Sequence, residues 1–187
     1  GDMQFEDITV KAGVTGEGRW SRGVTVVDIN NDGWMDVYVC ASMSKNGASR
    51  KNLLYINETA GKNNAPHFKE MAAAYGLDDT SFTTMANFFD YDNDGDLDVF
   101  LAVNEILDGE YPNKFRKLIK DGTFPSTCRL LRNDWDSALK HCVFTNVSRQ
   151  AGINIEGYTH GAVVADINKD GWKDVFVTND YLSCDVL

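Results

Sequence analysis

Three copies of a nine-residue, aspartate-rich segment constrain the fold of this chain more than any other feature. They span residues 28–36, 90–98 and 166–174. Each copy has an oxygen-bearing side chain at positions 1, 3, 5 and 9 and a glycine at position 6. Calcium takes six to eight oxygen ligands, and a tight turn with carboxylates on alternate residues supplies them. Because glycine also lets the backbone fold sharply around an ion, the spacing predicts up to three bound Ca²⁺ ions.

The position of the last carboxylate decides which kind of calcium loop this is. An EF-hand has a glutamate at position 12 and lies between helices, whereas position 12 here is Val39, Leu101 and Val177. The last acidic residue instead falls at position 9, directly before an apolar run that alternates like a strand. We therefore expect each loop to join two antiparallel strands.

The predicted metal ligands are the side chains at positions 1, 3, 5 and 9 and the backbone carbonyl at position 7. In that order they are Asp28, Asn30, Asp32, Asp36 and Trp34 in the first loop, Asp90, Asp92, Asp94, Asp98 and Asp96 in the second, and Asp166, Asn168, Asp170, Asp174 and Trp172 in the third. The alternative is a solvated Asp-Gly turn without metal. Three copies with the same spacing disfavour this metal-free alternative, because closely spaced carboxylates repel one another unless a cation neutralises them.

Composition narrows the class of protein and its compartment. The 187 residues suffice for one domain with a core, and the formal net charge of −10 argues against a nucleic-acid partner. The sequence has no apolar run long enough for a transmembrane helix. Because low-affinity calcium modules work outside the cytosol, we expect an extracellular, cell-surface or periplasmic location.

Cys40 is expected in the core, and the predicted strand pairing disfavours a disulfide between Cys128 and Cys142 without excluding it.

Further segments recur around the loops, which start at residues 28, 90 and 166. One set starts with phenylalanine, at residues 5–9, 68–72 and 144–148; a second precedes each loop, at 23–27, 85–89 and 161–165; a third follows it, at 52–57 and 129–133. Each unit thus offers four short strands with turns between them, which is the pattern of a β-propeller blade. Residues 5–9 are expected to be the last strand of a preceding blade.

The set that starts with phenylalanine, the aspartate loops and the set at residues 52–57 and 129–133 together resemble FG-GAP/VCBS repeats, as found in ASPIC/UnbV-type and cartilage-acidic-protein-like proteins. The loops are also similar to those of the integrin α-subunit propeller. The resemblance implies an all-β fold of four-stranded antiparallel blades, with calcium in the hairpin between the first two strands. It implies a single propeller segment of about two and a half to three blades, roughly residues 10–72, 73–148 and an incomplete 149–187. Because propellers close with about four to eight blades, we expect the remainder of a longer propeller, or a second copy, to close the ring. Asn30 and Asn168 depart from the acidic pattern and are expected to weaken their sites.

The connections on the side away from the calcium loops are the expected binding face. The insert at residues 105–127 includes Phe115, Leu118 and Ile119 at helical spacing, which predicts a short amphipathic helix that either caps the blade or contacts a ligand.

A second candidate surface combines two loops that enter first strands. It comprises Arg19, Trp20, Arg22, Tyr158 and His160, which form either a surface for a sugar or peptide or loop packing.

Catalysis has little support in the sequence. The three histidines belong to no metalloprotease motif, and neither a nucleophile elbow nor a phosphate-binding glycine loop is present. The leading hypothesis is a secreted or cell-surface module that binds a protein or glycan and uses calcium structurally. The alternative is part of an extracellular carbohydrate-active enzyme, a polysaccharide lyase or hydrolase, with His160 or Lys45 as a candidate base.

Overall fold

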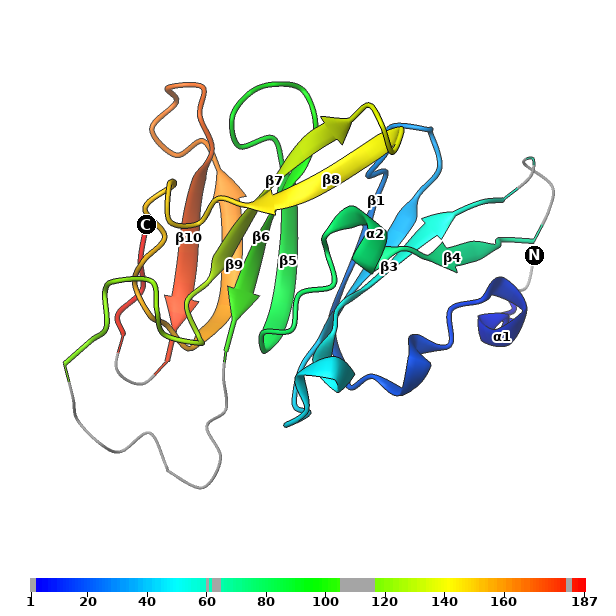
Figure 1. Cartoon of the computed structure of the whole chain (residues 1–187), viewed down its shortest axis with the longest axis horizontal. Coiled ribbons are helices and arrows are strands. Elements are labelled where there is room, and N and C mark those ends of the chain that lie inside the picture. The colour runs from blue at the N-terminus through cyan, green and yellow to red at the C-terminus, as the bar shows by residue number, and fades with distance from the viewer. Residues whose placement is uncertain (1–2, 60, 62–64, 105–116, 181–182) are drawn as a thin grey trace.

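The computed structural model describes residues 3–59, 61, 65–104, 117–180 and 183–187. Within them, ten strands form three antiparallel sheets (Figure 1). The first sheet contains β1 (Ser21–Val27), β2 (Asp36–Ala41), β3 (Leu53–Asn57) and β4 (Phe68–Glu70). The second contains β5 (Thr83–Phe89), β6 (Asp98–Val103), β7 (Arg129–Asp136) and β8 (His141–Asn146). The third contains β9 (Thr159–Ala165) and β10 (Asp174–Asn179). The all-β prediction is confirmed.

Each four-stranded sheet is a meander in which strands pair in chain order. We call β1–β4 the first blade, β5–β8 the second blade and β9–β10 the third unit. Their first strands are neighbours in the order β1, β5 and β9, so the three sheets stand side by side (Figure 1). The arrangement is consistent with successive propeller blades, and the described residues do not close a ring.

The helical elements are short connectors. They are the α-helices α1 (Thr9–Ala12) and α2 (Ala72–Tyr75) and the 3₁₀ turns Gly16–Gly18 and Gly47–Arg50. Each α-helix ends at a glycine with positive φ, and α2 lies against β8 and β3. No helix among the described residues has the length and apolarity needed to cross a membrane.

The core lies between the blades. Tyr38 and Leu54 of the first blade pack in one cluster with Val99, Leu101 and Leu131 of the second. The opposite face of the second blade packs in the same way on the third unit, through a second cluster that includes Phe100, Leu130 and Val177. Each interface thus buries apolar side chains from alternate strand positions, as packed sheets require.

The cysteines follow the sequence interpretation. Cys40 is fully buried in the first core cluster, as predicted. Cys128 and Cys142 are both buried and both free. Cys142 pairs across the strands with Trp135, near the far end of β7 from Cys128, so no disulfide joins them.

The strand predicted at residues 5–9 is wrong. Residues 3–8 have no regular structure, Phe5 is 97% exposed, and α1 begins at Thr9. The equivalent segments do form strands, because Phe68–Glu70 pairs with β3 and β8 pairs with β7. A last strand needs a third strand beside it, and no described residue offers one to residues 5–7.

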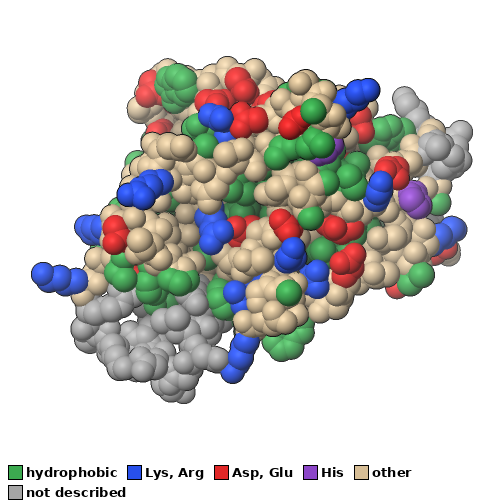
Figure 2. Space-filling model, in the orientation of Figure 1, with side chains coloured by type: hydrophobic (Ala, Val, Ile, Leu, Met, Phe, Trp, Pro, Cys, Tyr) green, Lys and Arg blue, Asp and Glu red, His purple; other side chains and the backbone are tan. Residues whose placement is uncertain are grey.

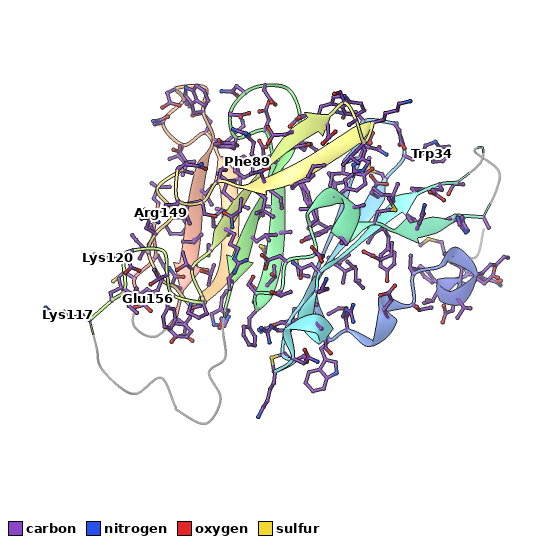
Figure 3. All side chains as sticks on the ribbon, viewed as in Figure 1. Trp34, Phe89, Lys117, Lys120, Arg149 and Glu156 are labelled. Atoms are coloured by element: carbon purple, nitrogen blue, oxygen red, sulfur yellow. The ribbon has the colours of Figure 1, made fainter. Side chains whose placement is uncertain are left out.

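The helix predicted in the insert is not found where the structure describes that segment. Phe115 lies outside the described residues, and residues 117–120 are not helical. The Ile119 N–H donates to Glu156 Oε1 at 2.6 Å, and the Ile119 carbonyl accepts from the Glu156 N–H at 3.0 Å. These two bonds hold Ile119 against the connection before β9, where Figure 3 labels Glu156 near Lys117 and Lys120. They replace the intrahelical bonds that the apolar spacing predicted.

Candidate metal centres

Each aspartate-rich loop is the hairpin connection between the first two strands of its sheet. The loops lie between β1 and β2, β5 and β6, and β9 and β10, and the position-9 aspartate is the first residue of the second strand. All three loops emerge at the same edge of the molecule, the upper edge in Figure 1. Figure 2 shows acidic side chains gathered along that edge. The predicted placement of the loops is confirmed.

The backbone of each loop turns left-handed at two positions. The position-6 glycines Gly33, Gly95 and Gly171 have φ of 86°, 98° and 92°. A Cβ at any of them meets no atom within 4 Å, so glycine is needed there for its conformation. Position 4 is also left-handed, with φ of 56°, 60° and 64° at Asn31, Asn93 and Lys169. The sequence interpretation missed this second turn, although asparagine tolerates that conformation better than most residues.

The position-1 carboxylate organises each turn. Asp28 accepts backbone N–H bonds from Asp32 at 3.1 Å and Gly33 at 2.9 Å. The equivalent bonds to Asp90 and Asp166 measure 3.0–3.1 Å. The three loops therefore share one hydrogen-bonded conformation around the position-1 carboxylate.

The position-9 carboxylates tie the loops to the third strands. Asp98 is fully buried, and its two oxygens accept the N–H groups of Tyr91 at 2.9 Å and Asn133 at 2.8 Å. The Asn133 side chain also donates to the Leu97 carbonyl at 3.2 Å. Asn57 makes the equivalent bonds in the first blade, to the Asp36 carboxylate and the Met35 carbonyl.

Asn57 and Asn133 are functional residues that the sequence interpretation missed. The available signal was that the third-strand motif ends in asparagine in both blades. In the third unit, Asp174 accepts from Ile167 N–H at 2.9 Å, and no described third-strand asparagine reaches its other oxygen.

The second loop brings three carboxylates together. One oxygen each from Asp90, Asp92 and Asp98 lies within 4.8 Å of the others, and this group could hold a metal ion. One side-chain oxygen of Asp92 and one of Asp96 are buried without a hydrogen-bond partner among the described residues. Buried, unpaired carboxylate oxygens are costly unless something compensates them. The donor set therefore fits a hard cation.

Asp94 and the other two loops differ in detail. Asp94 accepts the Asp96 N–H at 3.0 Å and is not part of the three-carboxylate group. In the first loop, the Asn30 amide donates to Asp32 at 3.0 Å, and in the third, Asn168 donates to Asp170 at 2.8 Å. An amide at position 3 thus partly neutralises the neighbouring carboxylate and removes one negative ligand, which makes the second loop the strongest candidate.

Electrostatics favour the same loop, in which the pKa values of three carboxyls are raised, whereas in the first loop burial raises the pKa of Asp36. Burial raises the pKa of Asp98 to about 6, in spite of its two backbone hydrogen bonds. Burial and the neighbouring Asp94 carboxylate raise the pKa of Asp96 to about 6, and burial also raises the pKa of Asp92. In the third loop, the Trp172 N–H instead lowers the pKa of Asp170. The second loop therefore holds uncompensated negative charge, which a bound cation would relieve.

The aromatic surface proposed on the opposite edge forms only in part. Trp20 is 64% exposed, whereas Tyr158 is buried and packs edge-on against Phe124 with ring centroids 6.5 Å apart. The His160 Nε2 atom lies 3.5 Å from Asp180 Oδ2. Tyr158 therefore serves loop packing, the alternative considered for it, and Trp20 remains the exposed aromatic side chain.

Comparison with known proteins adds one match. Residues 1–39 match the family model described as an FG-GAP-like repeat. No curated protein matches the chain. The matched segment includes α1, β1, the first aspartate loop and the start of β2, and its motifs recur in the second blade. The match identifies the repeat and does not distinguish the ASPIC/UnbV-type subgroup. Residues 1–39 of this chain are therefore identified as an FG-GAP-like repeat.

Proposed function

We propose that this chain is a calcium-binding, propeller-type module that acts outside the cytosol and binds a protein or a glycan, with calcium as a structural ion. The observation that carries the proposal is the group of Asp90, Asp92 and Asp98, together with the unpartnered buried oxygens of Asp92 and Asp96. All of these belong to one hairpin loop whose conformation recurs twice more in the molecule.

Calcium suits the loops better than other common metals. The predicted ligands are carboxylate, amide and carbonyl oxygens, and neither histidine nor cysteine occurs within the loops. Such hard oxygen sets favour calcium or magnesium over zinc or copper. Four aspartates and a backbone carbonyl on one flexible turn suit calcium, which accepts more ligands and less regular geometry than magnesium. Asp90, Asp92, Asp94 and Asp98 would hold the ion with the carbonyl of Asp96.

The proposed role of the ion is to stabilise the folded blade. The position-9 aspartate receives an N–H bond from the third strand in both complete blades, through Asn57 and Asn133. An ion bound to that aspartate would join the first hairpin to the third strand. Since a metal that binds only the folded state stabilises it, calcium would hold each blade together.

The proposed ligand face is the edge opposite the loops. There Trp20 is exposed, and Met43 lies nearby in the chain's β2–β3 connection and is also exposed. The Arg50 guanidinium lies 3.9 Å from the centre of the Phe82 ring and donates to the carbonyl of Ser44, the residue after Met43, so a cation held against an aromatic ring belongs to the same connection. Aromatic and arginine side chains are enriched in protein interfaces. The carbohydrate-active alternative stays a prediction.

The calcium proposal is tested by thermal unfolding in millimolar calcium and in EDTA. We expect the melting temperature of the wild-type chain to fall in EDTA, and the difference to shrink in Asp92→Asn, which removes one half-buried carboxylate of the group. Glu6→Gln is the matched control, because it removes one exposed carboxylate outside the loops. A wild-type melting temperature that EDTA leaves unchanged would contradict the proposal.

A further inference from the structure

The connection between β2 and β3 is fixed to the second blade at the edge opposite the aspartate loops. It contains the 3₁₀ turn Gly47–Arg50, which lies at the lower edge in Figure 1. The Arg50 Nε–H donates to the Thr80 carbonyl at 2.9 Å, and the guanidinium lies over the Phe82 ring. Because Thr80 and Phe82 directly precede β5, the second blade sets the position of the Arg50 side chain.

The bonds that hold this connection use only part of the Arg50 side chain. An arginine has five N–H donors. The Nε–H group donates to Thr80, and Nη1 donates to the carbonyls of Ser44 and Lys45. The two N–H groups on Nη2 have no hydrogen-bond partner among the described residues. The fold therefore holds the guanidinium in place without using Nη2.

The charge of Arg50 is also unpaired. Lys51, the next residue, forms an ion pair with Asp78, and Arg129 forms one with Asp79. In the part of the chain that the structure describes, no carboxylate pairs with Arg50. An arginine held in a fixed orientation loses little conformational freedom when it binds a carboxylate. In a chain with a formal net charge of −10, this unpaired cation is a candidate binding group for an anion.

Glycine at position 47 leaves Nη2 open to a ligand. A Cβ atom on Gly47 would lie 4.0 Å from Arg50 Nη2 and 3.9 Å from Thr80 Cβ, and it would meet no other atom within 4 Å. Gly47 is not among the glycines with positive φ, so the backbone there does not require glycine. A longer side chain at this position would instead cover Nη2.

A strained turn presents an apolar side chain on the same connection. Met43 has a φ of 67°, which residues other than glycine rarely adopt, and its side chain is 42% exposed. The Ser44 N–H donates to the Ser42 carbonyl at 2.9 Å across this turn, and Arg50 binds the Ser44 carbonyl. Arg50 thus fixes the turn that exposes Met43. Backbone strain of this kind is concentrated at functional sites.

We propose that Arg50 is the specificity-determining residue of the ligand face and binds a carboxylate of a protein ligand. Its Nη2 N–H groups donate to an aspartate or glutamate of the partner, and Met43 contacts an apolar side chain beside that residue. Hydrogen bonds to a charged acceptor are stronger than neutral ones, and arginine and methionine are both enriched in protein interfaces. The inference rests on the proposed function, because it names the partner of the proposed ligand face.

A protein ligand fits this surface better than a glycan. The Arg50 guanidinium already covers one face of the Phe82 ring, so that face is not free to stack on a sugar. Met43 instead offers a flexible apolar contact, which adapts to the side chains of a protein partner.

The test is an NMR titration of the isotope-labelled full chain in excess calcium. The probes are two peptides with blocked ends, Gly-Leu-Glu-Leu-Gly and Gly-Leu-Gln-Leu-Gly. The glutamate peptide should shift the Arg50 Nε–H and Met43 methyl signals. The glutamine peptide should bind about tenfold more weakly, because it offers the same shape without the negative charge.

A variant of Gly47 separates binding from structure. Replacing Arg50 itself would remove the bonds that hold the connection, whereas Gly47→Leu keeps them and places a side chain beside Nη2. The affinity of Gly47→Leu for the glutamate peptide should fall about tenfold. Ala48→Leu is the matched control, because it adds the same side chain at the next residue, which is exposed, and it should keep the wild-type affinity.

Three results would overturn the proposal. They are equal affinity for both peptides, wild-type affinity in Gly47→Leu, and no shift of the Arg50 signal at peptide concentrations up to about 10 mM. An Arg50 signal that galacturonate shifts and the glutamate peptide does not would assign the residue to an acidic glycan, and also overturns it. Peptide-induced shifts confined to other residues would reject Arg50 and leave the proposed binding module in place. The melting test in EDTA decides the calcium proposal independently of this titration.

Discussion

Replacing Asp98 with asparagine gives the sharpest prediction about the second loop. The Asp98 carboxylate is fully buried and accepts two backbone N–H groups, from Tyr91 and Asn133. An amide offers only one acceptor atom, so one of these donors loses its partner, at a cost of about 1–3 kcal/mol. The substitution also removes a buried negative charge. The rise in the pKa of Asp98 from 3.8 to about 6 corresponds to about 3 kcal/mol of destabilisation at neutral pH without metal.

These two effects oppose each other in EDTA, so the melting temperature of Asp98→Asn should lie close to that of the wild type there. In calcium the comparison changes, because the variant has lost a ligand. At a calcium concentration of about 100 Kd, one site contributes about 2.7 kcal/mol. For a chain of this size that is about 5–11 °C in melting temperature.

The assay is therefore the calcium-dependent rise in melting temperature, measured for the wild type, for Asp98→Asn and for Glu6→Gln. The variant should lose about 5–11 °C of that rise, and Glu6→Gln should keep all of it. An Asp98→Asn chain with the full wild-type rise would refute the reasoning.

Three further predictions follow from the same contacts. In EDTA, the raised pKa of Asp98 stabilises the fold below about pH 4, and this contribution is lost as the pH rises through about 6. The calcium-dependent rise in melting temperature should grow over the same range. Melting curves at several pH values, with calcium and with EDTA, check both trends. Gly76→Ala should destabilise the fold by more than about 1–2 kcal/mol, because φ is 71° and the new Cβ would lie 2.7 Å from the Phe144 carbonyl oxygen. Gly16→Ala, with φ of 72° and open space, is the matched control, and equal losses in urea unfolding would contradict the steric argument. Asn57→Ala removes the side-chain bond to the Met35 carbonyl and the two bonds that Asn57 Oδ1 accepts from Thr59, and should cost about 1–3 kcal/mol, so an unchanged urea midpoint would count against its role as a loop cap.

The repeat pattern made most of the fold predictable. Alternating apolar runs on either side of each Asp-Gly turn placed β1, β2, β5, β6, β9 and β10 correctly. This worked because a hairpin is a local structure whose turn and flanking strands are encoded together.

The errors arose where structure depends on partners distant in the chain. Residues 5–7 carry the same motif as Phe68–Glu70, but a strand forms only beside another strand, and they have no such neighbour among the described residues. The spacing of Phe115, Leu118 and Ile119 predicted a helix, yet the Ile119 N–H donates to the Glu156 carboxylate. Periodicity reports local preference and not such competing tertiary bonds.

The sequence predicted which residues belong to the candidate site, but it predicted their arrangement only in part. The spacing identified the carboxylates, and the structure groups Asp90, Asp92 and Asp98. The spacing did not reveal that the Asn133 N–H binds Asp98 from 35 residues away, because such a contact depends on the register between β6 and β7.

The most direct test of the central claim is anomalous diffraction from crystals grown in calcium. We expect an anomalous peak among Asp90, Asp92, Asp94, Asp98 and the Asp96 carbonyl, with ligand distances of about 2.3–2.6 Å. Weaker peaks are expected in the first and third loops, where Asn30 and Asn168 replace a carboxylate. A second loop without a peak in millimolar calcium, with its carboxylates as close together as described, would contradict the account.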